Sequence, residues 1–527
     1  MRSRKRRHTS GSRWAVAVAV ALSIVCACGN AQRGFGGVAS NDGGSSGDGA
    51  PSLTGDGGAL FPDGGSAASD AAVPCPVGLE CNVGCPNGGT TSISGTVYDP
   101  AGLDPLYNVA VFVPGSATLP ALPRGVPTGS AACSCSALFG GGAVVATATL
   151  VDGTFTLKNA PVGDTVPLVL QVGKWRRVLP SVKVTACKDN PLPDKSLTLP
   201  GTISAGDTND SMPDIAVSTG FADNLECLMR RIGVPAAEYV AGPATGGHIH
   251  VFSGGLTGGV GVGKPEHPGM TGAPASYQAL WSSQAQLMAY DIVLLSCEGA
   301  ETYNANPPAL EAYLNAGGRL FSSHFHYAWF SGPLTSGQAY AAPADWGSNL
   351  AAWASGGGGG NGQDGGALGG AIVQTLNGSS APFPKGQALA QWLALPAVAA
   401  LGKDGVPAAD VSIYQPRFNA LVGPPNKPSQ PWITADPPTN DPTMYFSFDT
   451  PVNAPPAPDG GAPAYCGRAV FSDLHVAGNP LTNDTGDPPQ GCAATALSPQ
   501  EKVLEFMLFD LSSCVIPDTV VPPPPLQ

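Results

Sequence analysis

Between about residues 90 and 200, short apolar runs alternate with turn residues. Residues 92–98 carry apolar side chains at alternate positions, and residues 109–113 form a second apolar run. Further runs at 154–157 and 168–172 are flanked by Asp-Gly and Pro-Val-Gly turns. A period of two with repeated turn signals is typical of short strands. We therefore predict a β-sandwich for this part of the chain.

From about residue 213 the apolar runs alternate with helical stripes. Residues 214–218 and 290–295 have the composition of buried strands, and residues 320–321 begin a third. The segments between them, 225–232 and 307–314, repeat apolar residues at helical spacing and end at glycines. Strand–helix–strand spacing predicts parallel strands joined by right-handed crossovers.

The C-terminal part of the chain completes this second region. Residues 443–448 and 468–471 predict strands, and Ser498-Pro499-Gln500-Glu501 is a capping box that opens a final helix. Residues 331–440 are rich in Gly and Pro, and we interpret them as insertions on a compact α/β core. We expect partial order there, at 383–395 and 432–433.

Four features of the first region together resemble the carboxypeptidase regulatory-like (transthyretin-like) domain. They are a Gly-x-Val strand at Gly95, the apolar second strand, an Asp-Gly-x-Phe hairpin at Asp152 and a Pro-x-Gly turn at Pro161. The resemblance covers roughly 110 residues. It implies a non-catalytic β-sandwich module.

Residues 290–329 resemble the class I glutamine amidotransferase-like fold, including its trehalose-utilisation-type relatives. Tyr290-Asp291 opens an apolar strand, a helix follows, and Gly317-Gly318-Arg319-Leu320-Phe321 begins the next strand. The resemblance implies a flavodoxin-like α/β fold with a mostly parallel sheet, plausible over 213–515. The family's nucleophilic Cys lies on the turn after that next strand, where this chain has Ser323-His324. We therefore expect a degenerate domain that does not hydrolyse glutamine.

The N-terminus predicts export. Six basic residues precede or border an apolar run of 12 residues at 14–25, which suits a signal peptide and is too short to span a bilayer. Val25-Cys26-Ala27-Cys28 resembles the lipobox of bacterial lipoproteins, with Cys28 as the lipidated residue; an ordinary cleaved signal is the alternative. Residues 29–74 are rich in Gly, Ser, Asp and Ala and predict a disordered tether. We expect a lipid-anchored protein at the outer membrane or cell surface.

These observations divide the chain at changes of composition. The expected parts are a signal peptide with lipobox (1–28), the tether (29–74), a Cys-containing β-sandwich (75–199), a linker (200–212), the α/β domain (213–515) with its insertion (331–440), and a Pro-rich tail (516–527).

Charge argues against nucleic acid as a partner. Without the signal peptide the chain has 19 basic and 38 acidic residues, a net charge of −19. Nucleic-acid binding requires clustered Lys and Arg, and the sequence has no such cluster after the signal peptide. We expect the membrane as a partner through the lipid anchor, and a glycan or an envelope protein as a ligand.

Cysteine usage agrees with an oxidising compartment. Thirteen Cys less Cys26 and Cys28 leave 11, an odd number, so at least one thiol lacks an intrachain partner. Disulfides are favoured over a metal site for the six Cys between Cys75 and Cys187. Cys133 and Cys135 are poorly spaced to bond each other. For the rest we predict the pairs Cys466–Cys492 and Cys227–Cys514, with Cys297 free.

Polar residues follow the predicted parallel strands at their carboxyl ends, where open α/β sheets bind ligands. His324 and His326, and likewise Asp473 and His475, are two residues apart, so in extended chain each pair faces one way. Imidazoles and a carboxylate are zinc ligands. These four residues are our candidate ligand or metal site, with hydrogen-bonded loop histidines as the alternative.

Weaker candidates surround this set. Cys297 and Glu298 follow the preceding strand, and a Cys297–His475 dyad would have the chain order of an amidotransferase nucleophile and base. His248 and His250 also have ligand spacing, but they begin a predicted strand, at the opposite edge of the sheet.

The sequence favours a non-catalytic surface lipoprotein that binds glycan or another envelope component. The alternative is an extracytoplasmic hydrolase, with a divalent metal as cofactor, that uses the His/Asp site. Whether any catalysis occurs is left open by the sequence. Open space beside a convergent His/Asp cluster would favour the enzyme, and a site packed by the insertion would favour binding.

Overall fold

The computed structural model describes residues 73–522, except 117, 130–131, 221, 255–275, 356–367, 399–409, 436–441, 457–462 and 477–487. The signal peptide with Cys28, and the tether through residue 72, lie outside the described residues, so both stay predictions. The described residues belong to one compact unit, Phe61–Gln527. None of their helices has the length and apolar character needed to cross a bilayer.

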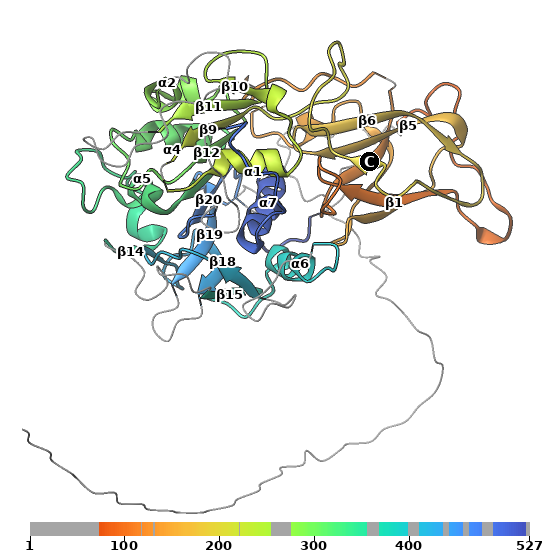
Figure 1. Cartoon of the computed structure of the whole chain (residues 1–527). Coiled ribbons are helices and arrows are strands. Elements are labelled where there is room, and N and C mark those ends of the chain that lie inside the picture. Colours follow the sequence, from red (N-terminus) through yellow and green to blue (C-terminus); the bar gives the residue numbers. More distant parts are fainter. Residues whose placement is uncertain are drawn as a thin grey trace, which may run out of the picture. The chain divides into compact units, whose positions relative to one another are not determined.

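The N-terminal β region consists of two four-stranded sheets (Figure 1). Their inward side chains, such as those of Ile93, Val111 and Leu168, are fully buried and belong to one core. The strands expected from the period-two pattern are confirmed. One sheet contains β1 (Ser92–Tyr98), β4 (Thr154–Lys158), β7 (Asp189–Pro191) and β8 (Leu197–Thr198); the other contains β2 (Ala110–Pro114), β3 (Ala143–Ala148), β5 (Gly163–Val172) and β6 (Trp175–Val184).

The second region is built on a ten-stranded mixed sheet. Six neighbouring strands are parallel, and they include all the strands predicted between 214 and 323. In sheet order they are β10 (Tyr239–Ala241), β11 (Ile249–Ser253), β9 (Ile215–Thr219), β12 (Ile292–Leu295), β13 (Arg319–Ser323) and β20 (Gly467–Ser472). The remaining four are antiparallel: β19 (Thr443–Thr450), β18 (Ser429–Ala435), β15 (Leu368–Ile372) and β16 (Asp410–Ile413).

The described part of the 331–440 insertion adds strands to this sheet. We expected the insertion to lie outside a complete α/β core. It contributes β15, β16 and β18, and a separate pair of short strands, β14 (Ala352–Trp353) and β17 (Ala420–Leu421). The sheet is therefore less uniformly parallel than expected. Strand β15 contains Gly370 at a close approach, because a Cβ there would lie 2.5 Å from the Ile413 side chain.

Helices are few and mostly short. The helices predicted at Pro307 and Pro499 begin there, whereas a third long helix begins at Pro384, where we expected only partial order. The capping box is confirmed: the Ser498 hydroxyl accepts from the Glu501 backbone N–H, and the Glu501 carboxylate from that of Ser498. The α-helices are α1 (Leu225–Arg231), α2 (Gln278–Trp281), α3 (Gln284–Leu287), α4 (Pro307–Asn315), α5 (Tyr327–Ser331), α6 (Pro384–Leu393) and α7 (Pro499–Ser512); the 3-10 helices are η1 (Pro86–Gly88), η3 (Ser136–Phe139), η4 (Ala236–Glu238), η5 (His324–His326) and η6 (Gly347–Asn349).

Helix α7 packs against both regions. Its Phe506 stacks on Tyr107, with ring centroids 5.8 Å apart, and its Phe509 contacts Trp175 at 5.7 Å. One cluster of buried apolar residues continues from the N-terminal strands through α7 into the large sheet. The two regions therefore share a core, which we did not expect from the composition of the 200–212 segment.

Five disulfides and one free thiol, Cys297, account for the described cysteines. The free Cys297 is confirmed, whereas the predicted pairs Cys466–Cys492 and Cys227–Cys514 are wrong. Cys133 and Cys135 do not bond each other, as expected; they cross to the second region and take Cys466 and Cys514. The observed pairs are Cys75–Cys81, Cys85–Cys187, Cys133–Cys466, Cys135–Cys514 and Cys227–Cys492.

The cross-links lead to a prediction for limited proteolysis. Residues 204–208 are exposed, so we expect an unspecific protease to cut there. The two fragments should run as one band on a non-reducing gel, because Cys133–Cys466 and Cys135–Cys514 join them, and should separate after reduction. A variant with both Cys133 and Cys135 changed to Ser is the control and should separate without reductant. Separation of the native fragments without reductant would contradict these two pairings.

Candidate metal centre

Three neighbouring parallel strands bring the candidate residues together. β13 pairs with β12 on one side and β20 on the other, in a register that sets Leu295 beside Ser322 and Ser323 beside Ser472. The carboxyl ends of all three strands therefore lie at one edge of the sheet. Residues one to three positions beyond these ends are Cys297, His324 and His475, and their side chains meet.

The ligand-type atoms of these three residues lie within 4.8 Å of one another. His324 Nδ1 is 3.2 Å from Cys297 Sγ and 2.9 Å from His475 Nε2. Bonds of about 2.0–2.1 Å to nitrogen and 2.3 Å to sulfur around a tetrahedral ion require edges of roughly 3.3 and 3.6 Å. The two distances from His324 Nδ1 are within a few tenths of an ångström of these edges, and all three atoms lie within 4.8 Å of one another.

The insertion supplies the outer contacts of this cluster. Gln415 Oε1 lies 2.8 Å from His475 Nδ1, and a carbonyl oxygen only accepts, so this contact assigns the proton to Nδ1. His475 Nε2 then accepts a hydrogen bond from His324 Nδ1–H at 2.9 Å, and a bound ion would replace that proton. Arg417 Nη2 is farther, 3.5 Å from the same Nδ1. A fixed tautomer is what hydrogen bonding around a metal-ligating imidazole normally provides.

Burial determines the protonation states. Cys297 is fully buried, and His324 and His475 are each 4% exposed. Burial, with the nearby Arg417 guanidinium, lowers the pKa of His475 to about 3, and burial followed by the neighbouring imidazole and guanidinium lowers the pKa of His324 well below its usual value. Both imidazoles are therefore neutral, which is their ligand form.

Cys297 differs from the two histidines, because a thiol must lose its proton and become charged before it binds a metal ion. Burial raises the pKa of Cys297 to about 12, although hydrogen bonds from the backbones of Phe325 and Gly299 to the sulfur act to lower it. A catalytic thiol is normally activated by a lowered pKa, so an activated Cys297–His475 nucleophile pair finds no support here. A bound cation would instead compensate the thiolate charge in this buried setting.

Two of the four residues of our main candidate set, His326 and Asp473, lie outside the three-residue cluster. His326 donates from Nδ1 to the Ser323 carbonyl, and its Nε2 lies 3.8 Å from Glu298 Oε1. The Asp473 carboxylate accepts the backbone N–H groups of Asn419 and Ala420, at 2.6 and 2.8 Å.

A turn in the backbone accounts for the position of His326. His324 adopts φ +46° directly after β13 and begins a 3-10 turn. Period-two spacing requires extended chain, so His324 and His326 do not face one way. Sequence reasoning ranked Cys297 too low, and missed Gln415 and Arg417, which no motif marks.

His248 and His250 lie at the opposite, amino-terminal edge of the sheet, as expected. His248 Nδ1 pairs with Glu238 Oε2 at 2.6 Å, and His250 Nε2 lies 3.5 Å from Asp214 Oδ1. Neither belongs to the group of metal-ligand type found among the described residues.

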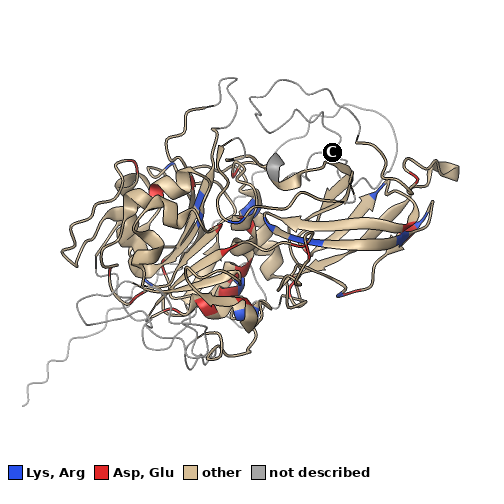
Figure 2. Ribbon diagram, turned by 90° about the horizontal axis from the view of Figure 1, so that it is seen from above, with Lys and Arg blue, Asp and Glu red and all other residues tan. Residues whose placement is uncertain are grey.

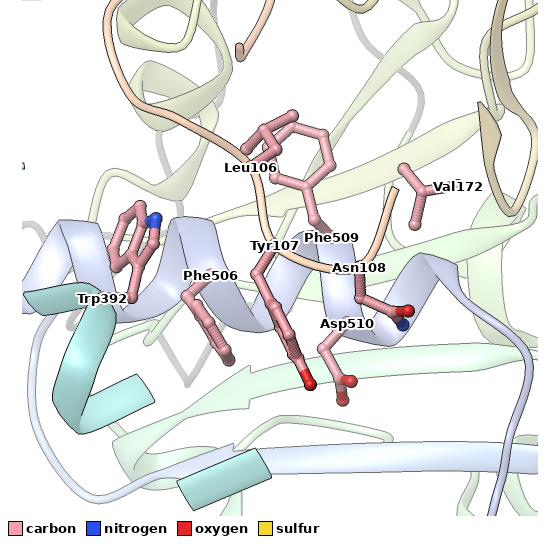
Figure 3. A pocket seen from close by; sticks show the side chains of 8 residues that line it. All are labelled: Leu106, Tyr107, Asn108, Val172, Trp392, Phe506, Phe509 and Asp510. Carbon is pink, nitrogen blue, oxygen red and sulfur yellow. The ribbon is translucent and has the colours of Figure 1, made fainter. Parts of the chain in front are cut away.

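A second candidate is a small pocket, with a cavity volume of about 10 Å³, between the N-terminal region, α6 and α7 (Figure 3). Two of its polar groups already have protein partners: the Trp392 indole donates to the Pro105 carbonyl, and Asp510 pairs with Lys385. The Phe506 ring stacks on Tyr107 instead of lying free for a ligand. The pocket is therefore a gap between packed elements and not a ligand site. Its lining residues are Leu106, Tyr107, Asn108, Val172, Trp392, Phe506, Phe509 and Asp510.

Comparison with known protein families, curated proteins and solved structures finds no match to this chain. The two family resemblances therefore rest on the quoted residues alone.

Proposed function

We propose that this chain is an exported, lipid-anchored protein that binds one transition-metal ion through Cys297, His324 and His475. The observation that carries the proposal is the convergence of one sulfur and two imidazole nitrogens within 4.8 Å, at the carboxyl edge of a parallel sheet. Thiolate and imidazole are ligands of zinc and copper. The flavodoxin-like and transthyretin-like architectures remain part of this proposal, as do the N-terminal anchor and its membrane partner.

Burial favours binding over catalysis. A catalytic metal site keeps a position open to water or substrate, whereas a structural or carrier site is closed. The three side chains here are at most 4% exposed, and Gln415 and Arg417 of the insertion pack against them. This closed arrangement supports a non-catalytic role and gives the hydrolase alternative less support. A glycan ligand has less support too, because the aromatic rings around the pocket are engaged with one another.

Metal analysis of the purified chain tests the proposal. After incubation with Zn²⁺ and removal of the excess, we expect one ion per chain and a raised melting temperature. An ion that binds only the folded state at 100 times its Kd adds about 2.7 kcal/mol to the free energy of unfolding. Cys297→Ser, His324→Ala and His475→Ala should each abolish the bound ion. Gln415→Met, which removes only the contact to His475, should weaken affinity by about 10–100-fold.

His248→Ala is the matched control, because His248 belongs to the same sheet and lies at its other edge. It should bind one ion like the unaltered chain. Circular dichroism of each variant separates loss of the ion from loss of the fold. A folded native chain without stoichiometric metal, or a cluster variant that retains it, would refute the centre.

A further inference from the structure

The types of ligand in this cluster favour some metal ions over others. The cluster offers one cysteine sulfur and two imidazoles and no carboxylate, since the carboxyl groups of Asp473 and Glu298 contact other groups. Copper(II) exceeds zinc in affinity for nitrogen and sulfur ligands, and sulfur also favours copper(I). Two imidazoles and one thiolate in a three-ligand arrangement are the donors of electron-transfer copper sites.

The ligands are held in place by contacts outside the cluster. The Cys297 backbone N–H donates to Ser323 Oγ at 3.1 Å and joins the ends of β12 and β13. Gln415 Oε1 contacts the His475 ring at 2.8 Å and holds it in place. Ligands fixed in this way keep one geometry in both oxidation states of the ion.

An aromatic side chain connects the buried centre with the surface. The Phe325 ring packs on the His324 imidazole, with centroids 4.0 Å apart. Phe325 is half-buried, whereas the three ligands are almost inaccessible. A substrate cannot reach the ion through this contact, but an electron can leave the His324 ligand through the ring.

We propose that the ion is copper and that the centre exchanges single electrons with a one-electron redox carrier. This inference rests on the proposed metal centre. In the oxidation step, copper(I) loses one electron to the oxidised carrier and becomes copper(II), while the carrier is reduced by one electron. The thiolate and both imidazoles stay bound, and no proton is transferred. The reverse step restores copper(I).

Copper loading of the whole purified chain tests the inference. We expect copper to displace zinc, and the copper(II) form to show thiolate-to-copper charge-transfer absorption and one paramagnetic signal per chain. Ascorbate should bleach the absorption and ferricyanide should restore it, with one electron per copper. Cys297→Ser should lose the charge-transfer band, and His248→Ala should keep it. Phe325→Leu should keep the band but exchange electrons with ferricyanide more slowly.

The outcomes separate this inference from the metal centre itself. Stoichiometric zinc binding that depends on Cys297, with no charge-transfer band in copper, overturns the copper inference and leaves the centre intact. Irreversible oxidation of Cys297 by copper(II), detected by mass spectrometry, overturns it as well. Absence of both zinc and copper from a folded chain overturns both proposals.

Discussion

Changing Arg468 to Met should lower the free energy of unfolding by about 3–5 kcal/mol, the usual cost of removing one partner from a buried ion pair. Arg468 on β20 is 2% exposed and bonds three carboxylates, from Asp449, Asp510 and Asp518, at 2.6–3.1 Å. The substitution leaves these charges in a site of low dielectric. Charged positions are sparse along the described chain (Figure 2), and beside this cluster Lys385 still pairs with Asp510.

Thermal and denaturant unfolding measure this effect, and we expect the melting temperature to fall by roughly 3–6 °C in a folded unit of this size. Arg468→Lys should be intermediate, because an ammonium keeps the charge but cannot form the fork with Asp449. Lys183→Met is the control: Lys183 forms an ion pair with Asp164 in which both side chains are more than 70% exposed, and such pairs contribute little. If Arg468→Met unfolds at the same temperature as Lys183→Met, the network does not stabilise the fold.

Much of the fold was predictable where the local pattern reflects burial. The strands β1 and β9 have apolar residues at the positions that the core requires, and the capping box marks the start of α7. Strand β15, Leu-Gly-Gly-Ala-Ile, lies between β18 and β16 and was not predictable, because close packing against Ile413 requires glycine where an apolar side chain would signal a strand. The disulfides depend on contacts between regions separated by up to 379 residues, which spacing does not encode.

The candidate site was predictable only in part, for a related reason. His324 and His475 follow from the rule that parallel strands end at one edge. His326 does not, since the positive φ of His324 turns the chain away from the extended form. Gln415 and Arg417 reach the site from the insertion, whose path no local pattern reveals. The sequence thus marks strand ends, whereas the backbone turn and the tertiary packing decide which side chains meet.

Glu505 is a buried carboxyl group that should make the protein less stable as pH rises. On α7 it is fully buried, and neither of its oxygens accepts a hydrogen bond. Burial, followed by the charges of Asp104 and Asp99, raises its pKa well above the usual value, and only the protonated form can donate to Asp104. Burial likewise raises the pKa of Asp99 to about 6. The Lys502 ammonium compensates the charge of Asp104, since its Nζ lies 2.9 Å from both carboxylate oxygens.

The direction of the pH effect follows from linkage. Between the unfolded pKa values near 4 and the raised folded values, the folded state binds more protons than the unfolded state, so the free energy of unfolding falls as pH rises. The stabilising contribution of the protonated Glu505 and Asp99 is fully present below about pH 4. The part due to Asp99 is lost through about pH 6, and that of Glu505 continues to fall above this pH. A shift of two pKa units corresponds to about 3 kcal/mol.

Glu505→Gln should therefore stabilise the protein at pH 8 and flatten the fall in stability between pH 5 and pH 8. The amide has nearly the shape of the protonated acid and can still donate to Asp104, but it carries no charge to desolvate. Denaturant unfolding at a series of pH values measures the change, with Asp164→Asn as a surface control that should leave the slope unaltered. A parallel fall in stability for Glu505→Gln and the unaltered chain would show that Glu505 ionises without cost, and would assign the pH dependence to other groups.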